Sequence, residues 1–133
     1  GRSYDPLVIS AEYLHINTGP VVVSVGKAGT DDLHKIGISR IVCFIGHGAI
    51  IHGAVIEDEC LIGMGATLLN GCKIGKHSLI GANALVTENT IIPPNSVAVG
   101  APAKVIKTIS DEQIKEIQES AIHYVELAKK GLL

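Results

Sequence analysis

An aliphatic residue recurs every six positions through the middle of this chain of 133 residues. Reading in sixes from Ile45 gives nine consecutive blocks, of which only the block at Ile51 is one residue short. The first position of every block is aliphatic: Ile45, Ile51, Ile56, Ile62, Leu68, Ile74, Ile80, Val86 and Ile92. The fifth position is small or β-branched: Ala49, Val55, Cys60, Ala66, Cys72, Ser78, Ala84, Thr90 and Ser96. A period this regular indicates a repetitive architecture.

The six-residue period predicts a left-handed parallel β-helix. Each block would form one flat side of a triangular coil, so that three blocks make a coil of about eighteen residues and successive coils stack about 4.8 Å apart. The aliphatic first residue and the small fifth residue would both point into the prism, and a Gly at the second position would relieve crowding at the bend. An ordinary sheet with two-residue alternation is the alternative, but nine blocks in phase disfavour it.

The composition fits a core without aromatic side chains. The chain is 47% hydrophobic but only 3% aromatic, so Ile, Val, Leu and Ala must fill the interior. A net charge of −2 offers no basic face for nucleic acid or an anionic membrane, and no apolar run is long enough to span a bilayer. The three Cys lack CxxC spacing, which disfavours a disulfide framework. The N-terminal sequence has no secretory signal pattern, so we expect a cytoplasmic protein.

Both flanks of the repeat lose the six-residue period, within what we predict to be a single domain spanning the whole chain. Residues 1–40 are expected to form an irregular N-terminal coil and loop, with a strand at 21–25 and the loop at 26–40. The β-helix is predicted over 41–107.

A C-terminal helix is predicted over 110–130. Pro102 should stop the last coil before it, and Ser110 with Gln113 has the spacing of a capping box at its start. Apolar residues then follow at helical spacing: Ile114, Ile117, Ala121, Val125 and Ala128. We expect this stripe to pack along the prism.

Two of the six His stand out as candidate metal ligands. His47 and His52 are five residues apart in consecutive blocks, and neither occupies an inward aliphatic position. Both can therefore project from the prism near a corner, and neutral imidazole is the commonest metal ligand among side chains. Three His plus water is a known catalytic zinc set, so a third ligand must come from elsewhere. Spacing alone leaves exposed turn histidines as an equal alternative.

The sequence around these histidines resembles the γ-class carbonic anhydrase family. The run IGHGAIIHGAVIEDECLIGMGATLLNGCKIG at 45–75 is similar to that family, and the stretch at 91–130 is similar to its C-terminal end. The resemblance covers about 41–130. Its IGHGAIIHG part is specific, whereas VGAPAKVIK at 99–107 is shared with hexapeptide acyltransferases.

The resemblance implies a metal site at a homotrimer interface, with Zn bound by three His, or Fe or Co in its place. The reaction would be reversible hydration of CO₂ to bicarbonate by a metal-bound hydroxide. His47 and His52 match the GHxxxxHG motif of the family, and YLHINTGPVVV resembles the segment of the first ligand, which favours His15 over its competitor His34. By this comparison, His15 and His52 of one chain meet His47 of a neighbour.

The chain also departs from the family pattern. An Arg-x-Asp stretch and a Gln-Asp pair precede the first ligand in the family, but PLVISAEY occupies that place here. Losses of groups around a metal site typically weaken it by about 10–100-fold. Tyr124 matches a Tyr on the family's C-terminal helix, with simple packing as its alternative, and Glu12 could relay protons or merely be solvated. His77 and His123 are expected at the surface.

Two other classes of function stay open. One is a hexapeptide acyltransferase, which would use a His as general base and bind acyl-CoA between prisms. The other is a non-catalytic trimeric scaffold or assembly subunit, because a fold does not fix a function. The missing Arg-x-Asp and Gln-Asp residues favour the scaffold, and the IGHGAIIHG pair favours metal.

Overall fold

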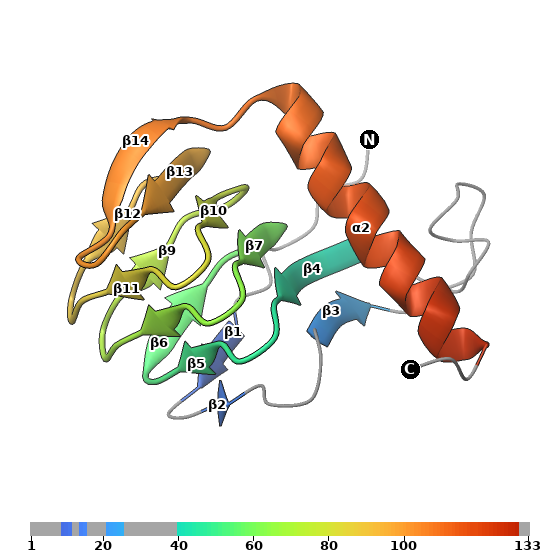
Figure 1. Ribbon diagram of the computed structural model, residues 1–133, viewed down its shortest axis with the longest axis horizontal. Coiled ribbons are helices and arrows are strands. Elements are labelled where there is room, and N and C mark those ends of the chain that lie inside the picture. Colours follow the sequence, from blue (N-terminus) through green and yellow to red (C-terminus); the bar gives the residue numbers. More distant parts are fainter. Residues whose placement is uncertain (1–8, 12–13, 16–20, 26–39, 131–133) are drawn as a thin grey trace.

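The computed structural model describes residues 9–11, 14–15, 21–25 and 40–130, and within them the chain forms a parallel β-helix followed by one helix (Figure 1). This confirms the fold class predicted from the repeat. The strands are β1 (Ile9–Ala11), β2 (Leu14–His15), β3 (Val21–Val25), β4 (Arg40–Ile45), β5 (Ile50–Ile51), β6 (Ala54–Ile56), β7 (Cys60–Ile62), β8 (Thr67–Leu68), β9 (Lys73–Ile74), β10 (Leu79–Ile80), β11 (Leu85–Val86), β12 (Ile91–Ile92), β13 (Ser96–Val99) and β14 (Lys104–Thr108). The helix is α2 (Asp111–Lys129).

Three coils stack in parallel register. In the six-stranded sheet, Phe44 on β4 pairs with Leu61 on β7, Leu61 with Leu79 on β10, and Leu79 with Val97 on β13. Each step is 18 residues except the first, which is 17 because the block at Ile51 is short. The sheet orders are β14-β13-β10-β7-β4-β3, β11-β8-β5-β2 and β1-β6-β9-β12.

The aliphatic first positions form the core as predicted. All nine are at most 3% exposed, and the fifth-position residues are buried as well except Val55 and Thr90, which are partly exposed. The short block corrects one assignment: Ala54 is the buried small residue there, while Val55 points outward. The missing residue therefore belongs to the turn and not to the strand. Burial and regular stacking of this kind are the main stabilising contribution in such a fold.

Turns join the three sheets at three corners, which we call the first corner (after β4, β7 and β10), the second corner (after β5, β8 and β11) and the third corner (after β6, β9 and β12). One residue in each turn has a positive φ. Seven of these nine positions hold Gly or Asn, which tolerate that backbone region best: Gly48, Gly65, Asn83, Gly53, Gly71, Asn89 and Asn95. The other two are Glu59 and His77, stacked at the third corner.

Antiparallel strands flank the parallel coils on both sides. β14 folds back along β13 as an antiparallel strand, with an irregular register between Val97 and Ala98. The parallel stacking therefore ends before residue 107, which was the predicted end of the β-helix. At the other end, β1, β2 and β3 pair antiparallel with β6, β5 and β4. The predicted strand at 21–25 is confirmed as β3, whereas the predicted loop at 26–40 lies almost entirely outside the described residues.

The helix α2 begins with the predicted capping box. The backbone N–H of Gln113 donates to Ser110 Oγ at 3.1 Å, and the backbone N–H of Ser110 donates to Gln113 Oε1 at 3.1 Å. Ile117 is buried and Ile114 partly buried against Leu61, Leu79 and Val97, on the outer face of the six-stranded sheet. The helix thus packs along the prism as predicted.

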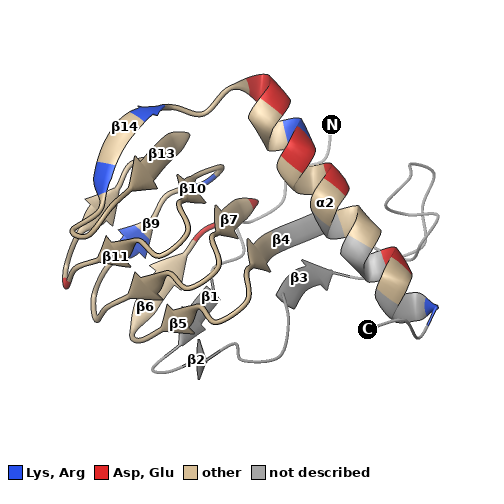
Figure 2. Ribbon diagram, viewed as in Figure 1, with Lys and Arg blue, Asp and Glu red and all other residues tan. Residues whose placement is uncertain are grey.

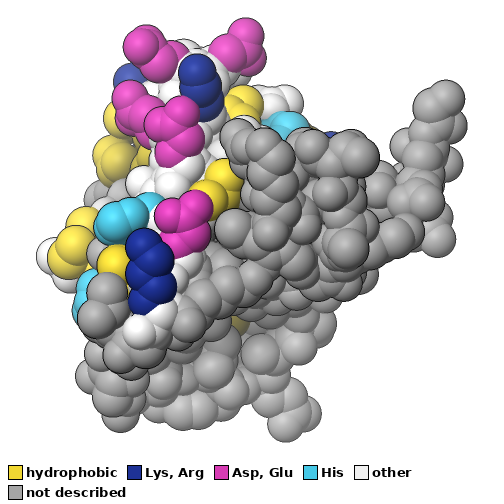
Figure 3. Space-filling view, turned by 90° about the vertical axis from the view of Figure 1, so that its right-hand side faces the viewer, with side chains coloured by type: hydrophobic (Ala, Val, Ile, Leu, Met, Phe, Trp, Pro, Cys, Tyr) yellow, Lys and Arg dark blue, Asp and Glu magenta, His cyan; other side chains and the backbone are white. Residues whose placement is uncertain are grey.

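Charged side chains gather away from the coils. Figure 2 shows most of them on α2 and β14, and the strands of the coils carry few. Acidic side chains, including Asp111 and Glu112, cluster over the first turns of α2 (Figure 3). Among the described residues, no helix has the length and apolar character needed to cross a membrane.

Candidate functional site

His47 and His52 occupy consecutive corners of the first coil. His47 follows β4 at the first corner, His52 follows β5 at the second corner, and both side chains are exposed. Neither belongs to the inward columns, which confirms that the two imidazoles project outward from the prism. A pair of exposed imidazoles carried by one rigid coil is suited to binding a metal or to moving a proton.

Local backbone geometry determines where His47 sits. A Cβ at Gly46 would lie 2.7 Å from the backbone nitrogen of Met64, so only Gly lets the next coil approach this closely. Gly48 then takes a φ of 69°, and the carbonyl of His47 accepts a hydrogen bond from the N–H of Gly65 at 2.8 Å. The turn that presents His47 is therefore held by the coil above it.

An apolar groove of about 310 Å³ opens beside His47. Its floor is formed by outward side chains of the six-stranded sheet, Phe44, Leu61 and Leu79, and its rim at the first corner includes Met64 and His47. Met64 is 59% exposed, which is unusual for a large apolar side chain. An exposed apolar groove of this size beside an imidazole is suited to a partner surface or an apolar substrate.

The third predicted ligand lies on a strand next to the pair. His15 ends β2, where its backbone pairs with Ile50 of β5, two residues before His52. Its side chain is outside the described part of the chain, as are Glu12 and His34. Tyr124 lies on α2, and its side chain is not described either. Among the described side chains, no three His, Cys, Asp or Glu form a group that could hold a metal.

A polar cluster at the third corner was not predicted. His77 was expected at the surface, but its side chain is only 23% exposed and its Nε2 lies 2.5 Å from Glu59 Oε2. Gln118 of α2 donates from Nε2 to Glu59 Oε1 at 3.0 Å. The sequence held one signal for this pair, because residues 18 apart stack at the same corner. His123 is exposed as expected.

The three thiols belong to the core, as predicted for Cys60 and Cys72. Burial raises the pKa of Cys60 to about 12 and that of Cys72 to about 11. Burial, and then the neighbouring Cys60, raise the pKa of Cys43 well above its ordinary value. All three are free and protonated at neutral pH, so none is a suitable nucleophile or metal ligand there.

Comparisons with known proteins match the repeat and the histidine region. Residues 53–88 match the family of bacterial transferase hexapeptide (six repeats). The chain is 46% identical to "Gamma carbonic anhydrase 2, mitochondrial" of Arabidopsis thaliana over 85 residues, covering 64% of this chain and 31% of that protein. It is 56% identical to "Probable carbonic anhydrase" of Methanocaldococcus jannaschii, covering 64% and 54% of the two chains.

A solved structure points to a second class of relative. A Bacillus cereus protein named as an acetyltransferase superposes with a TM-score of 0.61 at 43% identity, covering 62% of this chain and 48% of that one. The chain thus spans between about a third and about half of the length of these relatives. The relatives of this chain thus include proteins named as carbonic anhydrases and a protein named as an acetyltransferase.

Proposed function

We propose that this chain, which is similar in sequence to γ-carbonic anhydrases and shares their hexapeptide repeat, hydrates CO₂ to bicarbonate at a metal site between subunits. The observation that carries the proposal is the placement of His47 and His52 at consecutive corners of one coil, both exposed, within the motif that the resemblance identifies. The apolar groove beside His47 supports the proposal as well, because it leaves room at this corner for a substrate or a neighbouring subunit.

The donor chemistry fits Zn, with Fe or Co as alternatives. Neutral imidazoles bind these ions, and His15, His47 and His52 would hold the metal. When bound, zinc supplies Lewis-acid chemistry that makes water a nucleophile near neutral pH. The chain's own residues must then orient CO₂ and move the released proton to bulk water. Tyr124 and Glu12 are the candidates for these two roles.

A homotrimer would complete the site. The described side chains of one chain bring no three ligands together, and the remaining ligand would come from a neighbouring subunit, from His15 or from its competitor His34. The groove beside His47 supports the same arrangement, because burying Phe44, Leu61 and Met64 under a second prism removes exposed apolar area from water. His47 of one subunit would then face His15 and His52 of the next.

An acyltransferase is the second candidate. The acetyltransferase among the solved relatives and the apolar groove beside His47 both favour it, since such a groove could hold the arm of an acyl-CoA with His47 as general base. A non-catalytic trimeric scaffold is the third candidate, because PLVISAEY stands just before Leu14 and His15, where the resemblance would place a Gln-Asp pair. The three readings differ in metal content and in CoA binding, so one set of measurements separates them.

The test is metal content per chain on protein purified without a metal-affinity tag and supplied with zinc. We expect one metal per chain in the wild type, loss of metal in His47→Ala and His52→Ala, and no loss in the exposed control His123→Ala. CO₂ hydration would be assayed on the same samples. A wild type that stays metal-free would refute the proposal; CoA binding would then favour the acyltransferase, and a metal-free trimer without CoA binding the scaffold.

A further inference from the structure

The Glu59 cluster, which we define as Glu59, His77 and Gln118, contains the two backbone exceptions of the fold. Glu59 has a φ of 55° and His77 a φ of 59°, whereas the seven equivalent turn positions hold Gly or Asn. A longer side chain in this backbone region costs conformational energy that Gly and Asn avoid. Exceptions of this kind persist where the side chains make contacts that the default residues cannot make.

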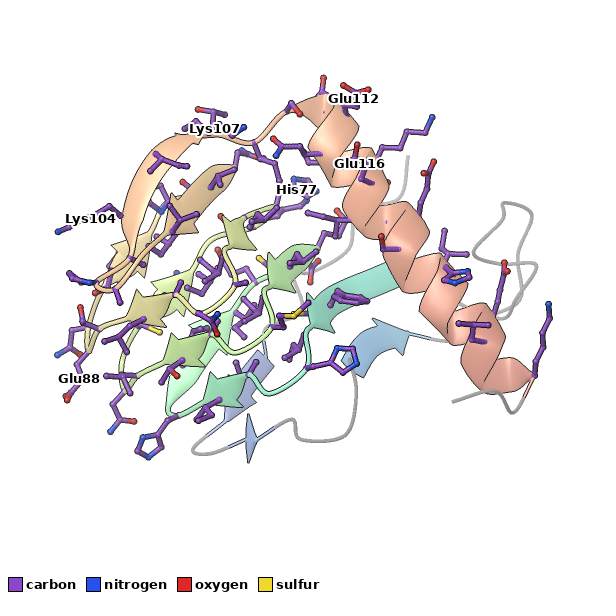
Figure 4. All side chains as sticks on the ribbon, in the orientation of Figure 1. His77, Glu88, Lys104, Lys107, Glu112 and Glu116 are labelled. Carbon is purple, nitrogen blue, oxygen red and sulfur yellow. The ribbon has the colours of Figure 1, made fainter. Side chains whose placement is uncertain are left out.

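The contacts made by these two side chains join the coils to the helix. Glu59 accepts from Gln118 Nε2 at 3.0 Å through one carboxylate oxygen and lies 2.5 Å from His77 Nε2 through the other. Glu59 and His77 are 26% and 23% exposed, so the pair is partly shielded from water. Figure 4 places His77 on the side of the coils that faces α2. Hydrogen bonds to a carboxylate are stronger than neutral ones.

The helix held by this cluster lines a second cavity, which shares two residues with the groove beside His47. A cavity of about 160 Å³ lies between α2 and the sheet, bounded by Gln113, Glu116 and Ser120 of the helix. Its floor is Leu61 and Leu79, which are also the floor of the apolar groove at the first corner. Because α2 packs on these two leucines, a movement of the helix that displaces their side chains would change the shape of the groove.

We propose that Glu59, His77 and Gln118 are positioning residues that fix α2 on the outer face of the six-stranded sheet and thereby set the shape of the groove in which His47 lies. The cluster does not touch the groove. It acts from the third corner through the helix, while the groove opens at the first corner. This groove is the one used by the proposed function, but the positioning role is independent of metal and of activity.

The test replaces both exceptions with the residue that the chain uses elsewhere. Glu59→Asn with His77→Asn relieves the backbone cost and removes the contacts to α2. We expect hydrogen exchange of the amides in the first half of α2 to accelerate by about tenfold or more, with the amides of β7 and β10 still protected. Asn95→Gly, one coil above at the same corner, is the matched control and should change neither the exchange of the α2 amides nor that of the β7 and β10 amides.

A second measurement reads the groove itself. Met64 is the single methionine of the chain and lines the groove, so its ε-methyl NMR resonance is a unique reporter. We expect this resonance to shift in the double variant and to stay unchanged in Asn95→Gly. The single variant Glu59→Gln keeps an acceptor for Gln118. It should retain most of the wild-type protection of α2 and a Met64 resonance close to that of the wild type. Unchanged protection of α2, equal loss of protection in coils and helix, or an unmoved Met64 resonance would each overturn the proposal.

Discussion

Replacing Gly63 with Ala tests how tightly the coils are stacked. A Cβ at Gly63 would lie 2.6 Å from the backbone nitrogen of Ala82 and 2.7 Å from the carbonyl oxygen of Ile80. Both atoms belong to the backbone of the next coil, so no side-chain rotation can relieve the contact. The second and third coils would have to separate at the first corner by more than half an ångström, since nonbonded heavy atoms prefer about 3.5 Å.

The cost follows from the bonds that such a separation stretches. The N–H of Gly63 donates to Ile80 at 2.8 Å, and the N–H of Asn83 donates to Met64 at 2.9 Å, across the same gap. Each such bond contributes about 1 kcal/mol net, and forcing a methyl group into a packed interior costs about 1–3 kcal/mol. We therefore expect Gly63→Ala to lower the free energy of unfolding by about 2–4 kcal/mol.

Urea denaturation at a fixed protein concentration measures this difference, because association would otherwise shift the midpoint. The matched control is Gly65→Asn in the same turn. Gly65 has a φ of 71°, which Asn tolerates, and the close contacts of its Cβ would be with the side chain of Asn83, which can rotate away. The control should cost less than about 1 kcal/mol. Equal losses in the two variants would refute the idea that backbone contact between coils makes Gly63 necessary.

Three further predictions concern the core, the helix and the buried thiols. Because Ile62 is 0% exposed, Ile62→Ala should lower the free energy of unfolding, measured in urea, by about 2–5 kcal/mol. Ile91 is 63% exposed, so the control Ile91→Ala should change it by no more than about 0.5 kcal/mol. Similar losses in the two variants would contradict the assigned core. Ser110→Ala should cost about 0.5–2 kcal/mol and fray the first turn of α2, visible as faster amide exchange there; an unchanged rate would count against the cap. Burial holds the pKa of Cys60 at about 12 in the folded chain, against an ordinary value of 9.0. The free energy of unfolding should therefore be constant below pH 9 and fall as the pH rises above 9, and it should fall less in Cys60→Ala. A flat profile from pH 8 to 11 would be the contrary result.

The period predicts the coils well because each inward position must repeat once per side of the prism. It fails at the short block, where it assigns Val55 inward although Ala54 is the buried residue. A period alone cannot say whether a missing residue belongs to the turn or to the strand. Outside the period, the β-branched run VVVSV predicts β3 as a strand but not its antiparallel pairing, since this run could pair with β4 in either direction.

The candidate site is predictable only in part. The outward direction of His47 and His52 follows from their places in the blocks, and the structure confirms it. The choice of His15 as third ligand stays a prediction, because a site shared between subunits depends on surfaces that no local pattern specifies. The contact between His77 and Glu59 could have been found by pairing residues one coil apart. Their shared backbone exception follows from their place in the turn, which Gly or Asn occupies elsewhere. The bond to Gln118 could not be predicted, since it depends on where the helix packs.

The antiparallel strands that flank the coils have a consequence for how such chains coexist in a crowded cell. The last strands of a coil without such cover have unpaired backbone N–H and C=O groups, which could pair with the first coil of another molecule. Repeating this contact from molecule to molecule would give an open filament. Here β3 covers β4 and β14 covers β13 in the opposite direction, and both pairs contain a break in register. Lys104 and Lys107 add like charges along the outer strand. At the C-terminal end this protects β13, whereas β11 and β12 remain the last strands of their sheets among the described residues. End-to-end stacking of complete coils is thereby disfavoured, and we expect association to use the sides of the prism, where His47 and the groove lie.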